Sequence, residues 1–362
     1  MEGFLFCDSI SKTIIGEKDI FIYGVGLMGK ALMECLKRNP YNKVINGFIV
    51  QNSDDNPREI DGVRICDVKS SSADKSALVL IALHEKNLEM ARDVLKAEGF
   101  RRVLEVSFDS DAWNHIRGNY YYANSILEEN VCWNTTVGPK CEVFVACSGN
   151  DHFVMDSSNA CLSEKPIRVG GCFSNEHRLS FSDDVGDNIS AKNSKYCELT
   201  ALYWVWKHRK ADYLGLSHYR RRFITDIVSQ GEELIDVDMV VTVPILNLEG
   251  VRNQYGRDHT LTDWDTMMEI IEEKHPDYYD VAISVQERKY YYGYNMFVAK
   301  YDVFCKYCEW LFDILFECER RIGDKEDPYQ NRYVGFLAER LLSVFIRKNN
   351  LKVGIAEKHF FS

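Results

Sequence analysis

The sequence predicts an α/β protein made of two domains. The chain has 362 residues, a length typical of two domains. In its N-terminal third, short apolar strand-like segments alternate with amphipathic helical segments, which is typical of a doubly wound sheet. A new series of strands and helices starts at residue 141, after a loop-rich, aromatic segment at 108–140. We therefore expect domains at residues 1–125 and 141–362, joined by a linker at 126–140.

The first domain carries a glycine motif directly after its first strand. Residues 19–23 predict a buried strand, and Gly24, Gly26 and Gly29 follow with the spacing G-x-G-x-x-G. A helix comes next, with its apolar positions on one face: Met28, Ala31, Leu32, Cys35 and Leu36. Glycines at such a turn allow a phosphate to approach the helix N-terminus. The three glycines are therefore candidates for a nucleotide-binding loop in a Rossmann-like domain.

The rest of the first domain continues the strand–helix pattern. Further strands are expected at 44–50, 77–83 and 102–106, and a helix at 87–95. In NAD-binding domains an acidic residue at the end of the second strand binds the ribose, but here the first acid is Asp54. Two interpretations therefore stand equal: a nucleotide or nucleotide-sugar site, and glycines that only permit tight packing. An NAD site stands behind both.

In the second domain, a histidine and three arginines follow one predicted strand. The apolar segment 212–217 leads into His218, and Arg220, Arg221 and Arg222 come directly afterwards. Substrates bind where the strands of α/β sheets end, and Arg side chains bind phosphate. In an extended segment, the histidine and the first and third arginines would lie on one side. We favour a diphosphate site here over a solvated basic edge.

The residues ahead of that strand hold three more polar candidates. A helix is expected at 194–208, with Asn193 or Ser194 as its cap. Asn188 and Asn193 lie in a polar stretch at the helix N-terminus, where an anion can bind. We favour the capping role for Asn193, and both interpretations stay open for Asn188. Glu198 lies near the start of an otherwise apolar helix. Either the helix dipole stabilises its charge or it has a catalytic role, and the two interpretations are equal.

A possible general base comes from a later segment. Tyr255, His259 and Asp263 recur every four residues, so one helical face would present all three. A histidine and a carboxylate together can supply a general base. The alternative is a helix N-terminus with acidic residues in its first turn.

Three other features of the second domain bear on function. Asn295 stands near the start of a predicted central strand. Glu339 and Arg340 lie in a helix whose other face is apolar, as a buried ion pair or as part of the site. Cys305 and Cys308 form a C-x-x-C inside a strongly helical run without a second pair at zinc spacing, so we expect them in the core.

Composition narrows the classes of function. The net charge of −11 argues against nucleic acid as a partner, because binding to a phosphate backbone needs a basic surface. The start of the chain lacks a basic segment followed by a long apolar run, and no stretch is apolar enough to span a bilayer. Twelve cysteines in a chain of this size fit a reducing compartment. We therefore expect a cytoplasmic protein.

Residues 141–355 resemble a bacterial family of capsular- and exopolysaccharide-synthesis proteins, long known only as a domain of unknown function and regarded as glycosyltransferases. The matching segments appear in order: GDNISAKNSKYCELTALYWVWKH, DYLGLSHYRRRF, QYGRDH, YNMFVAKYDVFCKYCEWLF and GFLAERLLSVF. The first hundred or so residues resemble the Rossmann-like domain of bacterial sugar N-acyltransferases, which binds a UDP-sugar. The resemblance departs after the strand at 141–146, where Cys147-Ser148 stands in place of an expected His-Lys.

The resemblance implies a GT-A-like fold and a hexosyltransferase-type enzyme. Such an enzyme moves a sugar from a nucleotide-sugar donor to a glycan or lipid-linked acceptor in capsular, exopolysaccharide or O-antigen synthesis, at the inner face of the plasma membrane. GT-A enzymes usually hold a divalent metal with Asp-x-Asp, but the comparable segment here begins Ser217-His218. Either Mn²⁺ or Mg²⁺ is bound elsewhere, or basic side chains neutralise the leaving diphosphate.

This hypothesis assigns a role to each candidate. The catalytic candidates are Asp263, His259 and Glu198. The donor- and diphosphate-binding candidates are His218, Arg220, Arg221, Asn188, Asn193, Tyr255 and Asn295. Two alternatives stay open: a non-catalytic nucleotide-sugar-binding regulator of polysaccharide synthesis, and, ranked third, an NAD-dependent oxidoreductase.

Overall fold

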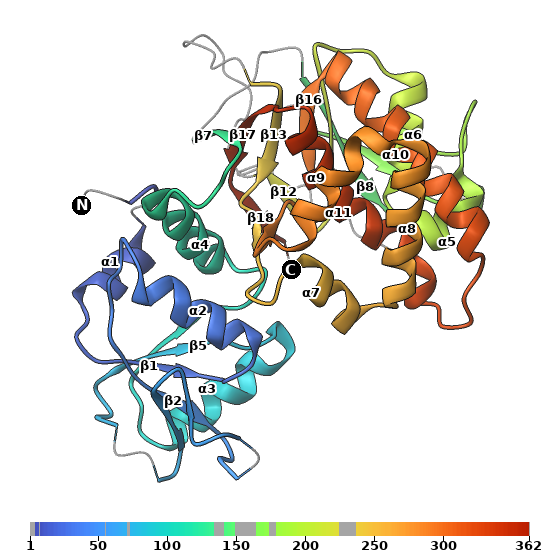
Figure 1. The fold of residues 1–362 in the computed structure, drawn as a ribbon. Helices are drawn as coiled ribbons and strands as arrows, with labels where there is room; N and C mark the ends of the chain where they lie inside the picture. The colour runs from blue at the N-terminus through green and yellow to red at the C-terminus, as the bar shows by residue number, and fades with distance from the viewer. Residues whose placement is uncertain are drawn as a thin grey trace. The chain divides into compact units, whose positions relative to one another are not determined.

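The computed structural model describes residues 4–6, 8–54, 56–70, 73–133, 141–148, 164–173, 179–223 and 237–361 (Figure 1). The chain divides into two compact units, Met1–Leu127 and Glu128–Ser362. Among the described residues, no helix is both long and apolar enough to cross a membrane.

The first unit is a doubly wound sheet. In its described part the strand order is β3-β4-β2-β1-β5-β6, and all pairs are parallel except β3 with β4. The strands are β1 (Ile20–Tyr23), β2 (Ile45–Val50), β3 (Glu59–Ile60), β4 (Val63–Asp67), β5 (Leu78–Ile81) and β6 (Arg102–Glu105). The strand order reverses between β1 and β5, the point where doubly wound sheets bind ligands. The Rossmann-like prediction is confirmed, although β3 and β4 were not predicted.

Helices cover this sheet because its strands are apolar on both faces. They are α1 (Ser9–Gly16), α2 (Leu27–Lys37), η1 (Glu85–Asn87), α3 (Leu88–Ala97) and α4 (Asp111–Asn124). Helix α3 buries Ala91 and Leu95 against Tyr23, Ile49 and Val79 of one face. Helix α2 packs against β1, β2 and α4.

Helix α4 occupies part of the segment that the sequence predicted as loop-rich. Its N-cap, Ser110, accepts the backbone N–H of Trp113 at 3.2 Å. Trp113 and Tyr121 are buried on this helix. Aromatic residues of this segment therefore form a core face at helical spacing.

The second unit is built on a mixed sheet. Its order in the described part is β10-β9-β8-β11-β16-β13-β17-β7. These strands are β7 (Asn130–Trp133), β8 (Cys141–Cys147), β9 (Glu164–Arg168), β10 (Phe181–Ser182), β11 (Tyr213–His218), β13 (Met239–Thr242), β16 (Phe297–Lys300) and β17 (Lys352–Ala356). Strand β16 is antiparallel to both β11 and β13, and the other pairs are parallel. Two small antiparallel pairs are β12 (Arg221–Phe223) with β18 (Lys358–Phe360) and β14 (Ile245–Leu246) with β15 (Tyr290–Tyr291).

The helices of the second unit pack on this sheet and on one another (Figure 1). They are α5 (Asn193–Tyr196), α6 (Leu199–His208), α7 (Val251–Asp258), α8 (Leu261–Lys274), α9 (Pro276–Gln286), α10 (Tyr301–Ile322) and α11 (Tyr333–Lys348), with short turns η2 (Gly171–Phe173), η3 (Ser190–Lys192) and η4 (Gln330–Arg332). Helix α10 packs on β11 and β16, α8 and α11 pack beside it, and α9 packs against α8 and α11. The predicted α/β class is confirmed in this unit as well.

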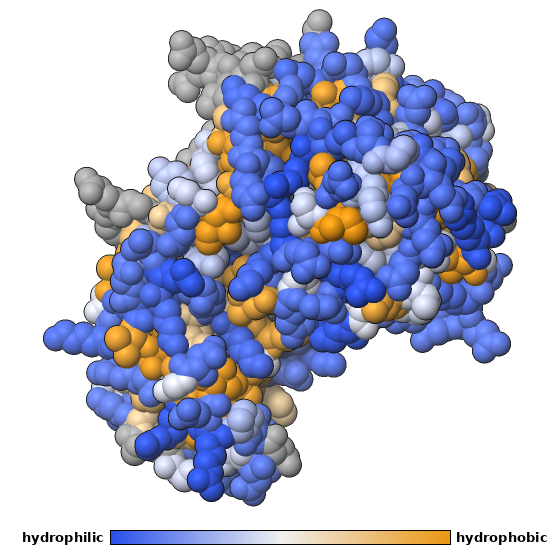
Figure 2. Space-filling model, viewed as in Figure 1, coloured by the Kyte–Doolittle hydropathy of each residue, from blue (hydrophilic) through white to orange (hydrophobic). Residues whose placement is uncertain are grey.

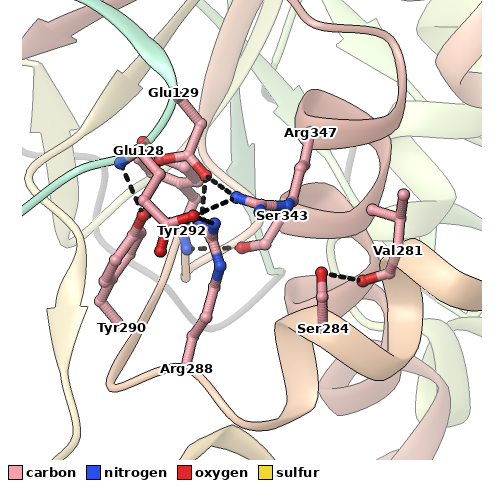
Figure 3. Close-up of polar contacts among 9 residues, drawn as sticks. All are labelled: Glu128, Glu129, Val281, Ser284, Arg288, Tyr290, Tyr292, Ser343 and Arg347. Atoms are coloured by element: carbon pink, nitrogen blue, oxygen red, sulfur yellow. Dashed lines mark hydrogen bonds and ion pairs between the residues drawn. The ribbon is translucent and has the colours of Figure 1, made fainter.

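A buried carboxylate fixes the start of the second unit (Figure 3). Glu129, whose side chain is 4% exposed, accepts hydrogen bonds from Arg288 (2.5 Å), Tyr290 (2.9 Å) and Tyr292 (3.2 Å). The following strand, β7, pairs with β17. Residues 130–133 therefore belong to the second sheet and are not part of a linker, because their backbone groups complete its edge.

Hydrophobic residues form small groups within a largely hydrophilic surface on the face that Figure 2 shows. Among the described residues, exposed large apolar side chains include Val44, Phe173 and Val185. Single exposed apolar side chains of this kind are normal for a globular protein.

Candidate functional site

A strained turn lies ahead of β16. Tyr294 and Asn295 have φ values of 68° and 50°, in the left-handed region that non-glycine residues avoid. Each such residue costs about 1 kcal/mol or more, and persists only when its surroundings hold it in place. The preceding Gly293 is also confined, because a Cβ there would lie 2.4 Å from Ile245 Cδ1.

Side chains from distant elements hold both peptide groups of this turn. His218, the last residue of β11, donates from Nε2 to the carbonyl oxygen of Tyr294 at 2.5 Å. The carboxylate of Glu339, on α11, accepts the backbone N–H of Tyr294. The turn is therefore bonded on both sides of one residue.

The side chain of Asn295 extends the same arrangement. It is 1% exposed, and its Nδ2 donates to Glu198 Oε1 at 2.6 Å and to the carbonyl oxygen of Gly335 at 3.3 Å. Its Oδ1 is buried and has no hydrogen-bond partner among the described residues. A buried amide oxygen of this kind is costly unless a ligand or water satisfies it.

Two cations lie against the ring of Tyr294. The guanidinium carbon of Arg221 is 5.0 Å from the ring centroid, and Nζ of Lys358 is 4.8 Å from it. They come from neighbouring strands, because β12 pairs with β18. We call Glu198, His218, Arg221, Asn295 and Glu339 the Tyr294 cluster.

The pKa values of His218 and Glu339 are shifted in opposite directions. Burial lowers the pKa of His218. Arg221 and Arg332 lower this pKa further, whereas Glu198 raises it. Burial raises the pKa of Glu339, and the neighbouring Arg340 guanidinium opposes that rise. Perturbed groups gathered around a strained turn at a strand end are typical of a functional site.

The three adjacent arginines have three different environments. Because β11 ends at His218 and β12 begins at Arg221, the segment is not one extended strand. Arg222 is buried and its Nε donates to Glu164 at 2.7 Å, whereas Arg220 is exposed and lies over the ring of Tyr219. The predicted shared side for His218, Arg220 and Arg222 is wrong, and His218 instead shares Tyr294 with Arg221.

Tyr255 and His259 form a second, aromatic group. Their ring centroids are 4.9 Å apart, and His259 stacks on Phe336 at 3.9 Å. The hydroxyl of Tyr255 and Nδ1 of His259 are buried without a hydrogen-bond partner among the described residues. Arg340 lies over the Tyr255 ring, with its guanidinium carbon 5.4 Å from the centroid.

Asp263 does not share a helical face with these two residues. Helix α7 ends at Asp258, and His259 is extended, so Asp263 belongs to the next helix, α8. Its buried carboxylate forms an ion pair with Lys325. The expected single face is therefore wrong, and the Tyr294 cluster is assembled without Asp263.

Asn188 and Asn193 make local contacts. Asn188 Oδ1 accepts the N–H of Ser190 at 3.1 Å, which closes a turn. Asn193 donates to the carbonyl oxygen of Cys197 at 2.8 Å. It does not cap a helix at 194–208, because the chain breaks at Cys197 (φ 51°) into α5 and α6.

The three glycines of the first unit differ in what surrounds them. A Cβ on Gly29 would lie 2.1 Å from the carbonyl oxygen of Gly24, and Gly24 itself has φ 109°. Both therefore serve tight strand–helix packing. Gly26, the N-cap of α2, has nothing within 4 Å of a Cβ position. Only this glycine opens onto space that a ligand can use.

The prediction from the sequence left out Tyr294 and Lys358. Nothing in the residue type of Tyr294 marks a left-handed backbone, and Lys358 is one basic residue in a short C-terminal strand. Glu339 was noted only as one half of a pair with Arg340. The polar dipeptide Glu339-Arg340 in an apolar helix was the one available signal.

A family model and a solved structure show similarity to this chain. No curated protein matches the chain. A solved structure, the apo form of the bifunctional glycosyltransferase WbbM, is 29% identical with a TM-score of 0.54. The match covers 62% of this chain but only 45% of that one. Residues 153–350, more than half of the chain, match the family model described as a domain of unknown function, DUF4422. The chain therefore belongs to the DUF4422 family.

Proposed function

We propose that this chain is a glycosyltransferase of the hexosyltransferase type. It moves a sugar from a nucleotide-sugar donor to a hydroxyl of a glycan or lipid-linked acceptor in capsular, exopolysaccharide or O-antigen synthesis. The observation that carries this proposal is the Tyr294 cluster, in a chain that is 29% identical to a bifunctional glycosyltransferase. Its work would be done in the cytoplasm, at the inner face of the plasma membrane.

The charge distribution supports a role for arginine in binding the diphosphate. Arg221 lies beside the Tyr294 ring, and the exposed Arg220 precedes it. Lys358 adds a further positive charge at the same ring. Guanidinium groups bind phosphate oxygens with two parallel hydrogen bonds, and they stabilise the charge that develops as the diphosphate leaves.

A divalent metal fits the residues around β11 poorly. Mg²⁺ and Mn²⁺ need several oxygen ligands. Among the described residues, no three His, Cys, Asp or Glu side chains lie together where they could hold a metal ion. The two carboxylates of the Tyr294 cluster, Glu198 and Glu339, are bonded to Asn295 and to the Tyr294 amide. We therefore propose that the arginines, and not a metal ion, stabilise the negative charge of the leaving diphosphate.

The first unit is proposed to bind a nucleotide or a nucleotide sugar, as its resemblance to sugar N-acyltransferases implies. Gly26 supports this role, because its position opens onto free space at the N-terminus of α2. Gly24 and Gly29 would shape the loop without contacting the ligand.

A thermal-shift panel tests the donor class. UDP-, GDP-, CMP- and dTDP-sugars, with and without Mn²⁺, and NAD are added to the wild type and to the variants Arg220→Ala/Arg221→Ala and Gly26→Val. Arg320→Ala is the control. Arg320 is 70% exposed on α10 and pairs with Glu317, so its loss removes a charge away from the site.

We expect one nucleotide sugar to stabilise the wild type and the control, by about 2.7 kcal/mol at a hundred times its Kd, and the double variant much less. Stabilisation that survives in the double variant but disappears in Gly26→Val would place the donor in the first unit. Stabilisation by NAD alone would overturn the proposal.

A further inference from the structure

The hydrogen bond between His218 and the turn fixes which ring nitrogen carries the proton. A carbonyl oxygen only accepts, so the bond of 2.5 Å to Tyr294 requires a proton on Nε2. In the neutral ring, Nδ1 then holds the free lone pair. No described residue forms a hydrogen bond with Nδ1.

The groups that face His218 keep the ring neutral until a proton arrives. Arg221 from β12 and Arg332 from the turn ahead of α11 oppose a positive charge on it, and burial does so more strongly. Glu198, at the start of α6, and the hydrogen bond to the Tyr294 carbonyl act in the opposite direction and raise the pKa of the ring. The Glu198 carboxylate is held by Asn295, so its negative charge stays in place to stabilise an imidazolium once one forms.

We propose, on the basis of the function proposed above, that His218 is the general base of the transfer, with Nδ1 accepting the proton of the acceptor hydroxyl. The O–H bond breaks as its proton moves to Nδ1, and the acceptor oxygen forms a bond to the anomeric carbon of the donor sugar. The bond from that carbon to the diphosphate oxygen breaks, and its electron pair leaves with the nucleoside diphosphate. Arg221 lies beside the same residue, Tyr294, where it meets the departing charge.

The strained turn fixes the orientation of the His218 ring and therefore the position of its Nδ1. A base contributes only when it lies within hydrogen-bond reach of the proton it removes. The carbonyl oxygen of Tyr294 orients the ring, while Glu339 holds the amide of the same residue. The backbone strain at Tyr294 and Asn295 is thus tied to the orientation of His218.

The variant His218→Gln separates this role from two others. A glutamine amide can donate to the Tyr294 carbonyl in place of Nε2, but it has no basic nitrogen. A purely structural His218 would therefore be replaced without much loss. If His218 binds the diphosphate, the variant should bind the donor more weakly. If His218 is the general base, turnover should slow while donor binding stays unchanged.

The experiment measures nucleoside diphosphate release from the nucleotide sugar that stabilises the protein, with nitrophenyl glycosides or water as acceptor. The control is His208→Gln, because His208 Nε2 likewise contacts a carbonyl oxygen, that of Asp187 at 2.8 Å, but on the exposed end of α6. Thermal unfolding of each variant is followed in parallel. His218→Ala with added imidazole is a second variant.

We expect kcat of His218→Gln to fall by about 10²- to 10⁴-fold with the Kd for the donor changed less than about twofold. The acid limb of the wild-type pH profile should disappear in this variant, and imidazole should restore part of the activity of His218→Ala. Equal kcat in His218→Gln and wild type, or a raised donor Kd with kcat intact, would overturn the inference and leave the transferase standing. Absence of release by the wild type with every donor would overturn the proposed function and this inference with it.

Discussion

At the scale of single residues, the partners of a side chain decide its role more than its type does. Arg220, Arg221 and Arg222 are consecutive, yet one is exposed, one lies against an aromatic ring and one is buried in an ion pair. Burial lowers the pKa of both His218 and His259. The first forms a hydrogen bond with the Tyr294 carbonyl oxygen, and the second stacks on Phe336. Sequence position alone does not distinguish these environments.

His259 gives a pH prediction. Burial, with the charge of Arg340, lowers its pKa from 6.5 to about 4. Between these values the unfolded chain binds a proton that the folded chain does not, so the free energy of unfolding falls as pH drops from about 6.5 to about 4. The loss is at most about 3 kcal/mol.

Replacing His259 by Phe should remove this pH dependence, because Phe keeps the stack on Phe336 and cannot be protonated. Urea unfolding at pH 7.5 and pH 5 measures the effect, with His208→Gln as the control. If the variant loses as much stability as the wild type between these pH values, the environment described for His259 is wrong.

At the scale of elements, close contacts between backbone segments set which substitutions are tolerated. The loop between β1 and α2 is tight at Gly29 and open at Gly26. Strand β7 is joined to the second unit through its pairing with β17 and through Glu129 just before it. These two places give matched pairs of substitutions.

In the first unit, Gly29→Ala should destabilise by about 1–3 kcal/mol, because the new Cβ would lie 2.1 Å from a backbone oxygen. Gly26→Ala should change the free energy of unfolding by much less, since nothing lies within 4 Å of its Cβ position. Chemical denaturation of the two variants compares them directly. Equal losses would contradict the difference between the two glycines.

In the second unit, Glu129→Ala should cost about 3–5 kcal/mol, because it leaves the buried Arg288 without its buried partner. The adjacent Glu128, 58% exposed, also pairs with Arg288 but in solvent, so Glu128→Ala should cost about 1 kcal/mol or less (Figure 3). Denaturant midpoints of the two variants provide the measurement. A larger loss for Glu128 than for Glu129 would show that burial is not what matters here.

At the scale of the whole molecule, the hydrophobic periodicity and the positions of turn-forming residues predicted the architecture well. The strand after residue 19, the glycine loop and the helix after it predicted the fold of the first unit, because a doubly wound sheet repeats local patterns. The polar contents of the second unit were predicted in part: Glu198, His218, Arg221 and Asn295 do come together. These residues lie at or next to the ends of strands and helices, positions that a sequence can mark.

The remaining parts of the site depend on contacts that no local pattern encodes. The left-handed backbone at Tyr294 is maintained by His218, 76 residues earlier, and by Glu339 on a later helix. The end of α7 moved Asp263 onto another helix, so a spacing of four residues misled. The helix break at Cys197 likewise depends on the side chain of Asn193, which bonds its carbonyl oxygen.

The most direct test of the central claim is nucleoside diphosphate release. Wild-type protein and Arg220→Ala/Arg221→Ala are assayed with UDP-, GDP-, CMP- and dTDP-sugars and a glycoside acceptor. We predict release from one donor by the wild type, and a loss of at least about 100-fold in kcat/KM in the double variant. Release by neither protein with any donor, or equal release by both, would contradict the account.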